Sequence, residues 1–117
     1  MDPDERPGYV RRSITLRDEE LPNGTRSALW AWIGPQGELH LDGQDLGDPA
    51  LLPGGDGEYE YFRTIAAEDF PALLELLQGR PDDDVLALLA RDYARQRSFE
   101  LELKLRNAPF PVRLHVL

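Results

Sequence analysis

The chain has 117 residues, of which 41% are hydrophobic and 30% charged, and it carries a net charge of −9 and no cysteine. This length suits one core, so we predict a single domain over residues 1–117, with residues 1–8 as a frayed N-terminal arm. The lack of cysteine excludes a disulfide framework, a thiolate metal site and a cysteine nucleophile.

The negative charge also bears on partners and location. An acidic domain repels phosphate backbones and anionic membrane surfaces and is steered toward basic proteins, so we expect no nucleic-acid partner. No apolar run approaches the roughly 18 residues of a membrane span, and the acidic N-terminus lacks the basic and apolar regions of a secretory signal. We therefore expect a cytoplasmic protein with no membrane partner.

The first half of the chain predicts strands. Residues 10–16 alternate between apolar and polar, and a turn follows at residues 18–24. Residues 27–33 are apolar on both faces, which is typical of a central strand covered on both sides. The turn tetrapeptide at 34–37 and the alternation over 38–42 complete a predicted hairpin.

Residues 43–57 contain five glycines and two prolines, which predicts a long loop. Loops of about 15 residues are uncommon in compact domains and are often functional. After this loop, the aromatic and β-branched residues of 58–66 predict another strand, and the alternation over 111–117 predicts a terminal one.

Two segments between these last strands have helical periodicity. Apolar residues spaced by three and four predict helices over 68–78 and 82–96. The pattern of residues 98–107 suits either a strand or a helix, because every second residue is apolar. The pairs Glu100–Lys104 and Glu102–Arg106 favour a short helix, with Ser98 as its N-cap.

Together these elements predict an α+β fold. It consists of a mostly antiparallel sheet of four to five strands, with two to three helices packed on one face.

Candidates for catalysis are few. The two histidines, His40 and His115, fall on the polar faces of predicted strands, and the three serines have no nucleophile-elbow context. We therefore predict no catalytic residues and a protein that is not an enzyme.

Aspartates crowd around the predicted loop, but their spacing does not fit a calcium-binding EF-hand. Counted from Asp42, the fifth position is Leu46 and the twelfth is Pro53. No glycine-rich phosphate-binding motif is present either. We predict no metal site and no cofactor.

The charge distribution is the strongest functional signal. No Lys or Arg occurs between Arg26 and Arg63, whereas seven acids do: Glu38, Asp42, Asp45, Asp48, Asp56, Glu58 and Glu60. This window is either a solvated polar edge or a docking surface for a cationic partner. For the second reading we assign these acids to partner binding together with Tyr59 and Tyr61, and Trp30 or Trp32 are further possible aromatic anchors.

Several motifs resemble a group of small uncharacterised actinobacterial proteins. They are GELHLDGQDLGD, GEYEYFRTIAAEDFPALLELLQG, PDDDVLALLARDYA and SFELELKLRNAPFPV, within residues 28–113. The resemblance implies this order of elements and favours a helix over 98–107, but it implies no activity. By size and acidity the chain also resembles the immunity proteins of bacterial polymorphic toxin systems.

The leading hypothesis is a non-enzymatic protein-binding domain, an immunity or antitoxin-type inhibitor that neutralises a basic toxin by occlusion. One alternative is a small enzyme or ligand-binding protein with a pocket at the 43–57 loop, using Asp42, Asp45 or His40. Another is a homo-oligomeric structural protein with Trp30 and Trp32 across a symmetric interface. The oligomeric state stays open.

Overall fold

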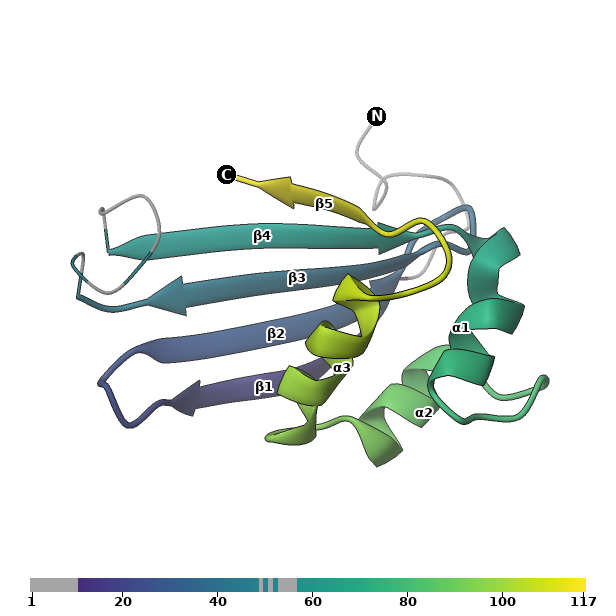
Figure 1. Cartoon of the computed structure of the whole chain (residues 1–117), viewed down its shortest axis with the longest axis horizontal. Coiled ribbons are helices and arrows are strands. Elements are labelled where there is room, and N and C mark those ends of the chain that lie inside the picture. Colours follow the sequence, from purple (N-terminus) through teal and green to yellow (C-terminus); the bar gives the residue numbers. More distant parts are fainter. Residues whose placement is uncertain (1–10, 49, 51, 53–56) are drawn as a thin grey trace.

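The fold is built on one antiparallel sheet whose strands lie side by side in chain order. The computed structural model describes residues 11–48, 50, 52 and 57–117, so the predicted arm over 1–8 lies outside the described residues. The strands are β1 (Arg12–Glu20), β2 (Arg26–Ile33), β3 (Leu39–Leu46), β4 (Glu58–Ile65) and β5 (Arg113–Val116) (Figure 1).

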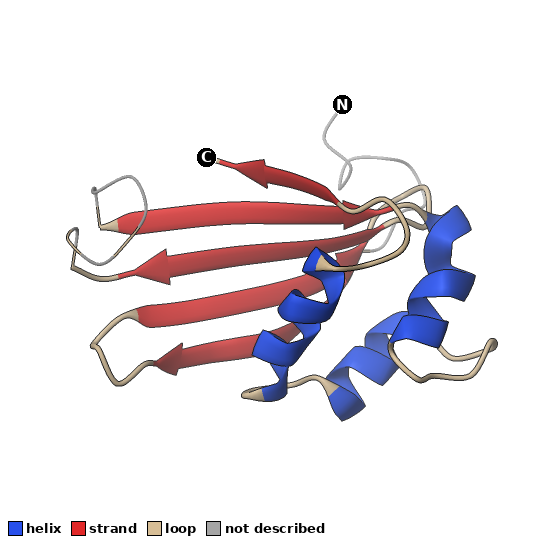
Figure 2. Cartoon of the chain, viewed as in Figure 1, coloured by secondary structure: helices blue, strands red, loops and turns tan. Residues whose placement is uncertain are grey.

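The helices that the structure describes lie between β4 and β5 in the sequence and pack on the same face of the sheet (Figure 2). They are η2 (Ala67–Asp69), α1 (Phe70–Leu76), α2 (Val85–Asp92) and α3 (Arg97–Arg106). The predicted α+β class is confirmed. The helices predicted over 68–78 and 82–96 are present, in shorter form.

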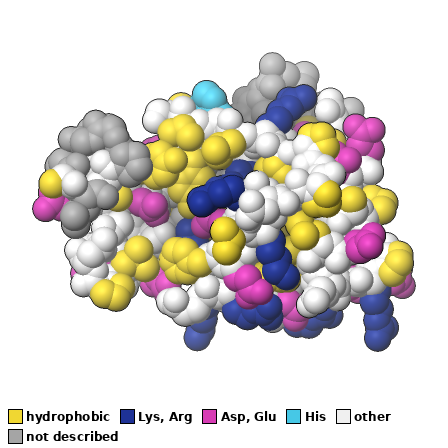
Figure 3. All heavy atoms as spheres, in the orientation of Figure 1, with side chains coloured by type: hydrophobic (Ala, Val, Ile, Leu, Met, Phe, Trp, Pro, Cys, Tyr) yellow, Lys and Arg dark blue, Asp and Glu magenta, His cyan; other side chains and the backbone are white. Residues whose placement is uncertain are grey.

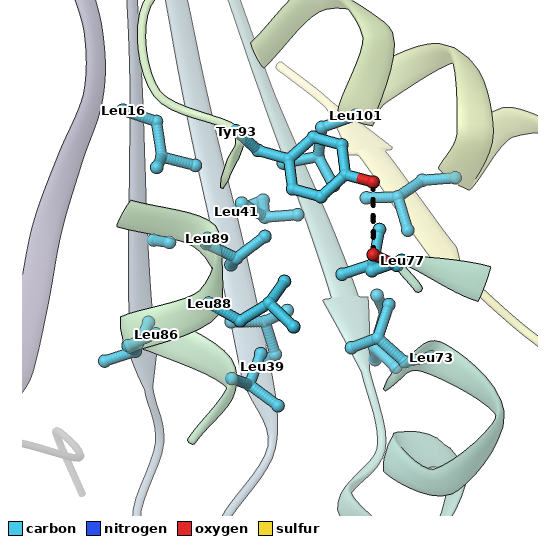
Figure 4. Close-up of a cluster of buried hydrophobic side chains, with 14 of the residues drawn as sticks. Leu16, Leu39, Leu41, Leu73, Leu77, Leu86, Leu88, Leu89, Tyr93 and Leu101 are labelled. Carbon is cyan, nitrogen blue, oxygen red and sulfur yellow. Dashed lines mark hydrogen bonds between the residues drawn. The ribbon is translucent and has the colours of Figure 1, made fainter. Parts of the chain in front are cut away.

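The core lies between the helices and the sheet face that they cover, which we call the inner face. Apolar side chains from both layers are fully or almost fully buried, among them Leu29, Leu41, Ile65, Leu73, Leu77, Leu88, Leu89 and Leu101. Tyr93 is buried at the centre of this cluster and donates a hydrogen bond from its hydroxyl to the carbonyl oxygen of Leu77 (Figure 4). Burial of each such side chain stabilises the fold by about 1.5–3 kcal/mol.

The prediction that β2 is covered on both sides is wrong. The opposite face of the sheet, which we call the outer face, is covered by none of the described helices or strands, and Trp30 there is 36% exposed. The apolar pattern wrongly predicted a second covering layer, because the contacts of Trp32 come from neighbouring side chains of the same sheet. Its ring stacks on His40, and its indole nitrogen donates to Asp42.

β1 is longer than predicted, because it continues to Glu20 and the turn begins only at Leu21. The register of β1 against β2 shifts between Thr15 and Arg17, so Leu16 is the extra residue of a β-bulge. After the bulge the alternation is reversed. Arg17 lies opposite Leu29 on the inner face and is 2% exposed.

β3 also exceeds its prediction, since residues 43–46 belong to the strand and not to the loop predicted over 43–57. Gly43 was one of the five glycines from which the loop was predicted. It lies opposite Tyr61, and a Cβ added to Gly43 would be 2.1 Å from Cζ of that ring. Glycine therefore occupies a strand position here because the tyrosine ring fills the space of its missing side chain.

The helix favoured over 98–107 is confirmed as α3, but two details were wrong. Ser98 is not the N-cap, which is Gln96; it lies inside the helix and is fully buried. Glu100 pairs with Lys104 at 3.8 Å as expected. Glu102 does not pair with Arg106, because it reaches the sheet instead.

We predict that Gly43→Ala destabilises the protein by about 1–3 kcal/mol, because the added methyl group overlaps the Tyr61 ring. Chemical denaturation of Gly43→Ala, Tyr61→Ala and the double variant measures the effect. In the Tyr61→Ala background the same methyl group should cost much less. If the Gly43→Ala change lowered the free energy of unfolding equally in both backgrounds, the Tyr61 ring would not be the reason that residue 43 is glycine.

Asp84 is the N-cap of α2, where its carboxylate accepts a hydrogen bond from the backbone nitrogen of Ala87. We expect Asp84→Ala to cost about 1 kcal/mol in the free energy of unfolding.

A hydrogen bond from Arg12 holds the Asp84 pKa below its ordinary value of 3.8, so the charged form stabilises the fold above that pH. The advantage of Asp84 over an Asp84→Asn variant, which retains a capping oxygen, should shrink as pH falls below 3.8. Thermal unfolding at two pH values tests this, and a pH-independent difference would contradict it.

Candidate functional site

The acids predicted to bind a partner are divided between the two faces of the sheet. Asp42 lies opposite Trp30 and Phe62, and Glu58 and Glu60 share its face, which is the outer one. Asp45 lies on the inner face, opposite Ser27 and Tyr59. Of the six acids that the structure describes, Asp42, Glu58 and Glu60 therefore occupy strand positions on the outer face.

The other predicted residues lie outside these strand positions. Glu38 belongs to the β2–β3 turn, where one carboxylate oxygen accepts a hydrogen bond from the backbone nitrogen of Gln36. Its other oxygen lies 3.5 Å from Nε2 of His40, which is on the outer face. Asp48 follows the far end of β3, and Asp56 lies outside the described residues. Tyr59 and Tyr61 occupy the inner face with Asp45 and so do not accompany the outer-face acids.

The outer face presents an ordered aromatic group. Nε1 of Trp32 donates to Oδ2 of Asp42 at 2.9 Å, and the Trp32 ring stacks on His40 with 4.1 Å between centroids. The Arg11 guanidinium lies 3.9 Å from the centre of the Trp32 ring. Because these contacts fix the ring, it can be presented to another molecule with little further loss of conformational freedom.

Two further carboxyl groups, those of Glu58 and Glu60, lie on the same face toward the other end of β3. The side-chain amide of Gln44 donates to Glu58 at 3.1 Å and to Glu60 at 3.4 Å. A hydrogen bond with Glu58, partial desolvation and the charge of Glu58 raise the pKa of Glu60 above its ordinary value. A cation bound beside the two carboxyl groups would relieve the repulsion between their charged forms.

The inner face holds a buried charge network that the sequence did not indicate. Arg17 donates from Nε to Ser27 at 3.0 Å, from Nη1 to Ser98 at 2.9 Å, and from Nη2 to Glu102 at 2.5 Å. The other oxygen of Glu102 accepts from Nη1 of Arg63 at 2.6 Å. One carboxylate of α3 thus binds two guanidinium groups of the sheet.

Tyr61 completes this network. Its hydroxyl accepts from Nη2 of Arg17 at 3.2 Å and lies 3.2 Å from Oε1 of Glu102 as a donor. Burial and the Glu102 charge raise the pKa of Tyr61, so the phenol remains protonated and can donate. The faces of Phe99 and Tyr61 lie against Arg17 and Arg63, at 3.9 and 5.1 Å from the guanidinium carbons.

Beside this network a groove of about 690 Å³ opens between α3, β4 and β5, and we call it the α3 groove. Its floor is formed by residues of the network with Asp45 and Tyr59. Its walls are mostly apolar and include Phe99, Leu103, Phe110, Val112 and Leu114. Figure 3 views the molecule from this side and shows hydrophobic side chains gathered around basic ones near the centre.

Sequence reasoning missed Arg17, Arg63 and Glu102. A signal for Arg63 was present, because residues 59, 61, 63 and 65 alternate onto one face and Ile65 belongs to the core. No comparable signal existed for Arg17, since the bulge at Leu16 reverses its side.

Residues proposed for the enzyme or ligand alternative do not form one site. His40 and Asp42 lie on the outer face, whereas Asp45 lies on the inner face. Among the described residues, no three His, Cys, Asp or Glu side chains are close enough together to hold a metal ion.

In the part of the chain that the structure describes, no helix has the length and apolar character needed to cross a membrane. Comparison of the chain with family models, curated proteins and solved structures found no match.

We predict that Glu102→Ala destabilises the fold by about 3–5 kcal/mol, because it leaves two buried guanidinium groups without their carboxylate. Glu100→Ala is the matched control on the same helix. Its carboxylate is 47% exposed and pairs only with Arg97 and Lys104, so its loss should cost less than about 1 kcal/mol. Urea denaturation measures both. Similar losses in the two variants would contradict a structural role for the network.

Proposed function

We propose that this chain is a non-enzymatic protein-binding domain that docks the outer face of its sheet on a basic partner protein. The observation that carries the proposal is the outer face itself, where the exposed Trp30 and the carboxyl groups of Asp42, Glu58 and Glu60 share one sheet surface. Antiparallel sheets commonly leave one face in solvent, but that face is then normally polar. Large aromatic side chains on such a face are typical of an interaction surface.

The charges on this face favour a cationic partner. Asp42, Glu58 and Glu60 lie on neighbouring strands, and the whole chain has a net charge of −9. Such a field steers basic proteins toward the surface and speeds their association at low ionic strength.

The tryptophans supply the short-range contact. Trp30 is 36% exposed, and Trp32 is held in place by Asp42 and His40. Tryptophan is enriched among the residues that dominate binding energy, and a pre-ordered ring loses little entropy on binding. Trp30 and Trp32 therefore replace Tyr59 and Tyr61 as the aromatic anchors of this proposal.

The biological role that we propose is that of an immunity or antitoxin-type inhibitor, which neutralises a basic toxin by covering its active site. Small size, acidity and an open sheet face support it. A flat face of this kind can cover a catalytic cleft without entering it. The competing role is self-association through Trp30 and Trp32 in a symmetric dimer, which the exposure of Trp30 favours.

The test begins with the purified chain as bait in a lysate of its source organism, followed by purification of the retained protein. Association rates are then measured at two salt concentrations for the parent and for a variant carrying Asp42→Asn, Glu58→Gln and Glu60→Gln. We expect a basic partner, association that slows about threefold or more in this variant at low salt, and a weaker salt dependence. Trp30→Ala should instead speed dissociation.

The matched control removes three exposed acids on the helical side with Glu68→Gln, Glu75→Gln and Asp82→Asn. It has the same net charge as the outer-face variant, so its smaller effect on association would localise the interface. Equal slowing in both variants, or an acidic partner, contradicts the proposal. A chain that dimerises at micromolar concentration and loses this with Trp30→Ala favours the competing role.

A further inference from the structure

The α3 groove lies on the face opposite the proposed protein interface and has the dimensions of a small-molecule site. Its volume of about 690 Å³ falls within the range of about 300–1,000 Å³ that is usual for ligand pockets. Such pockets typically combine apolar walls with a few polar groups that orient the ligand. The α3 groove has this composition, with leucine and phenylalanine side chains above a charged floor.

Arg63 is the arginine of this floor that has unused hydrogen-bond donors. Its side chain is only 9% exposed, and its one hydrogen bond to a described residue runs from Nη1 to Glu102. A guanidinium group has five N–H donors, and those of Nε and Nη2 have no acceptor among the described residues. By contrast, Arg17 uses Nε, Nη1 and Nη2 in hydrogen bonds to protein groups.

The net charge of the groove lining also favours an anion. Its lining contains three basic residues, Arg17, Arg63 and Arg106, and two acidic ones, Asp45 and Glu102. The lining therefore has a net charge of +1, whereas the whole chain has a net charge of −9. Arg63 lines this groove and retains unused donors, so an anion in the groove could accept charge-assisted hydrogen bonds from it.

We infer that the α3 groove binds a small amphipathic carboxylate, with its head on Arg63 and its apolar body against the groove walls. The free donors of Arg63 suit the two oxygens of a carboxylate, which a guanidinium can bind side by side. Leu114 lies directly opposite Arg63 in β5, so the apolar wall begins beside the head group. Leu103 and Leu114 are each 56% exposed, and contact with an alkyl or aryl body would remove them from water.

Decanoate is the probe, and decanol is its uncharged counterpart of equal chain length. Isothermal titration calorimetry with the intact chain should show one decanoate site and binding of decanol at least about tenfold weaker, because decanol offers no charge to Arg63. Arg63→Met should weaken decanoate at least about tenfold and leave decanol almost unchanged. Arg113→Met, on an exposed arginine of β5, is the matched control and should bind decanoate like the parent.

Leu103→Glu keeps the inference testable if Arg63→Met fails to fold, because residue 103 is exposed on the groove wall. Its new charge should repel decanoate and reduce affinity about tenfold or more, whereas Leu46→Glu, on the outer face, should not. Equal affinity for decanoate and decanol overturns the inference, as does parental decanoate binding by a folded Arg63→Met variant or by Leu103→Glu. Absence of decanoate binding to the parent at millimolar concentration also overturns it. None of these outcomes bears on the proposed outer-face interface, whose readout is a protein partner.

Discussion

The Glu102 carboxylate, shared between two buried guanidinium groups, is the interaction on which the arrangement of the domain depends. Arg17 comes from β1 and Arg63 from β4, so one side chain of α3 joins strands that are separated by β2 and β3. A buried charge without an opposite charge is strongly destabilising. A shift of α3 that separated Glu102 from Arg17 and Arg63 would therefore be costly, so the network fixes the position of the helix. The fully buried Ser98 adds a neutral acceptor for Arg17 from the same helix.

This network also explains why the inner face has two parts. Toward α1 and α2 the strands contribute leucine and isoleucine to a dry core, where Leu39, Leu41 and Ile65 meet the helices. Beneath α3 the same strands contribute Arg17, Tyr61 and Arg63, and the space beside them is the α3 groove. A helix held by hydrogen bonds to charged groups can lie above a hollow, whereas a helix held only by apolar packing would be expected to close it.

Periodicity in the sequence predicted most of the helices and strands but not the residues of the site. The spacing of Leu73, Leu74 and Leu77 predicted a helix because tertiary packing agrees with local preference there. Gly43 was misread as a loop residue because its role depends on a ring in another strand. The positions of Arg17 and Glu102 could not be predicted either. The bulge at Leu16 turns Arg17 to the inner face, and Glu102 pairs with the distant Arg17 instead of the nearby Arg106.

The two faces of the sheet would therefore recognise other molecules by different physics. On the outer face Glu58 is exposed and Glu60 is partly exposed, so their effect is long-range, depends on net charge and weakens as salt screens it. Arg63 is surrounded by protein, where interactions are strong only at contact and salt screens them little. A chain with a net charge of −9 repels anions at a distance, so an anion in the α3 groove must be held by hydrogen bonds and apolar contact. The outer face is thus suited to capturing a large basic partner quickly, and the groove to selecting a small anion by shape.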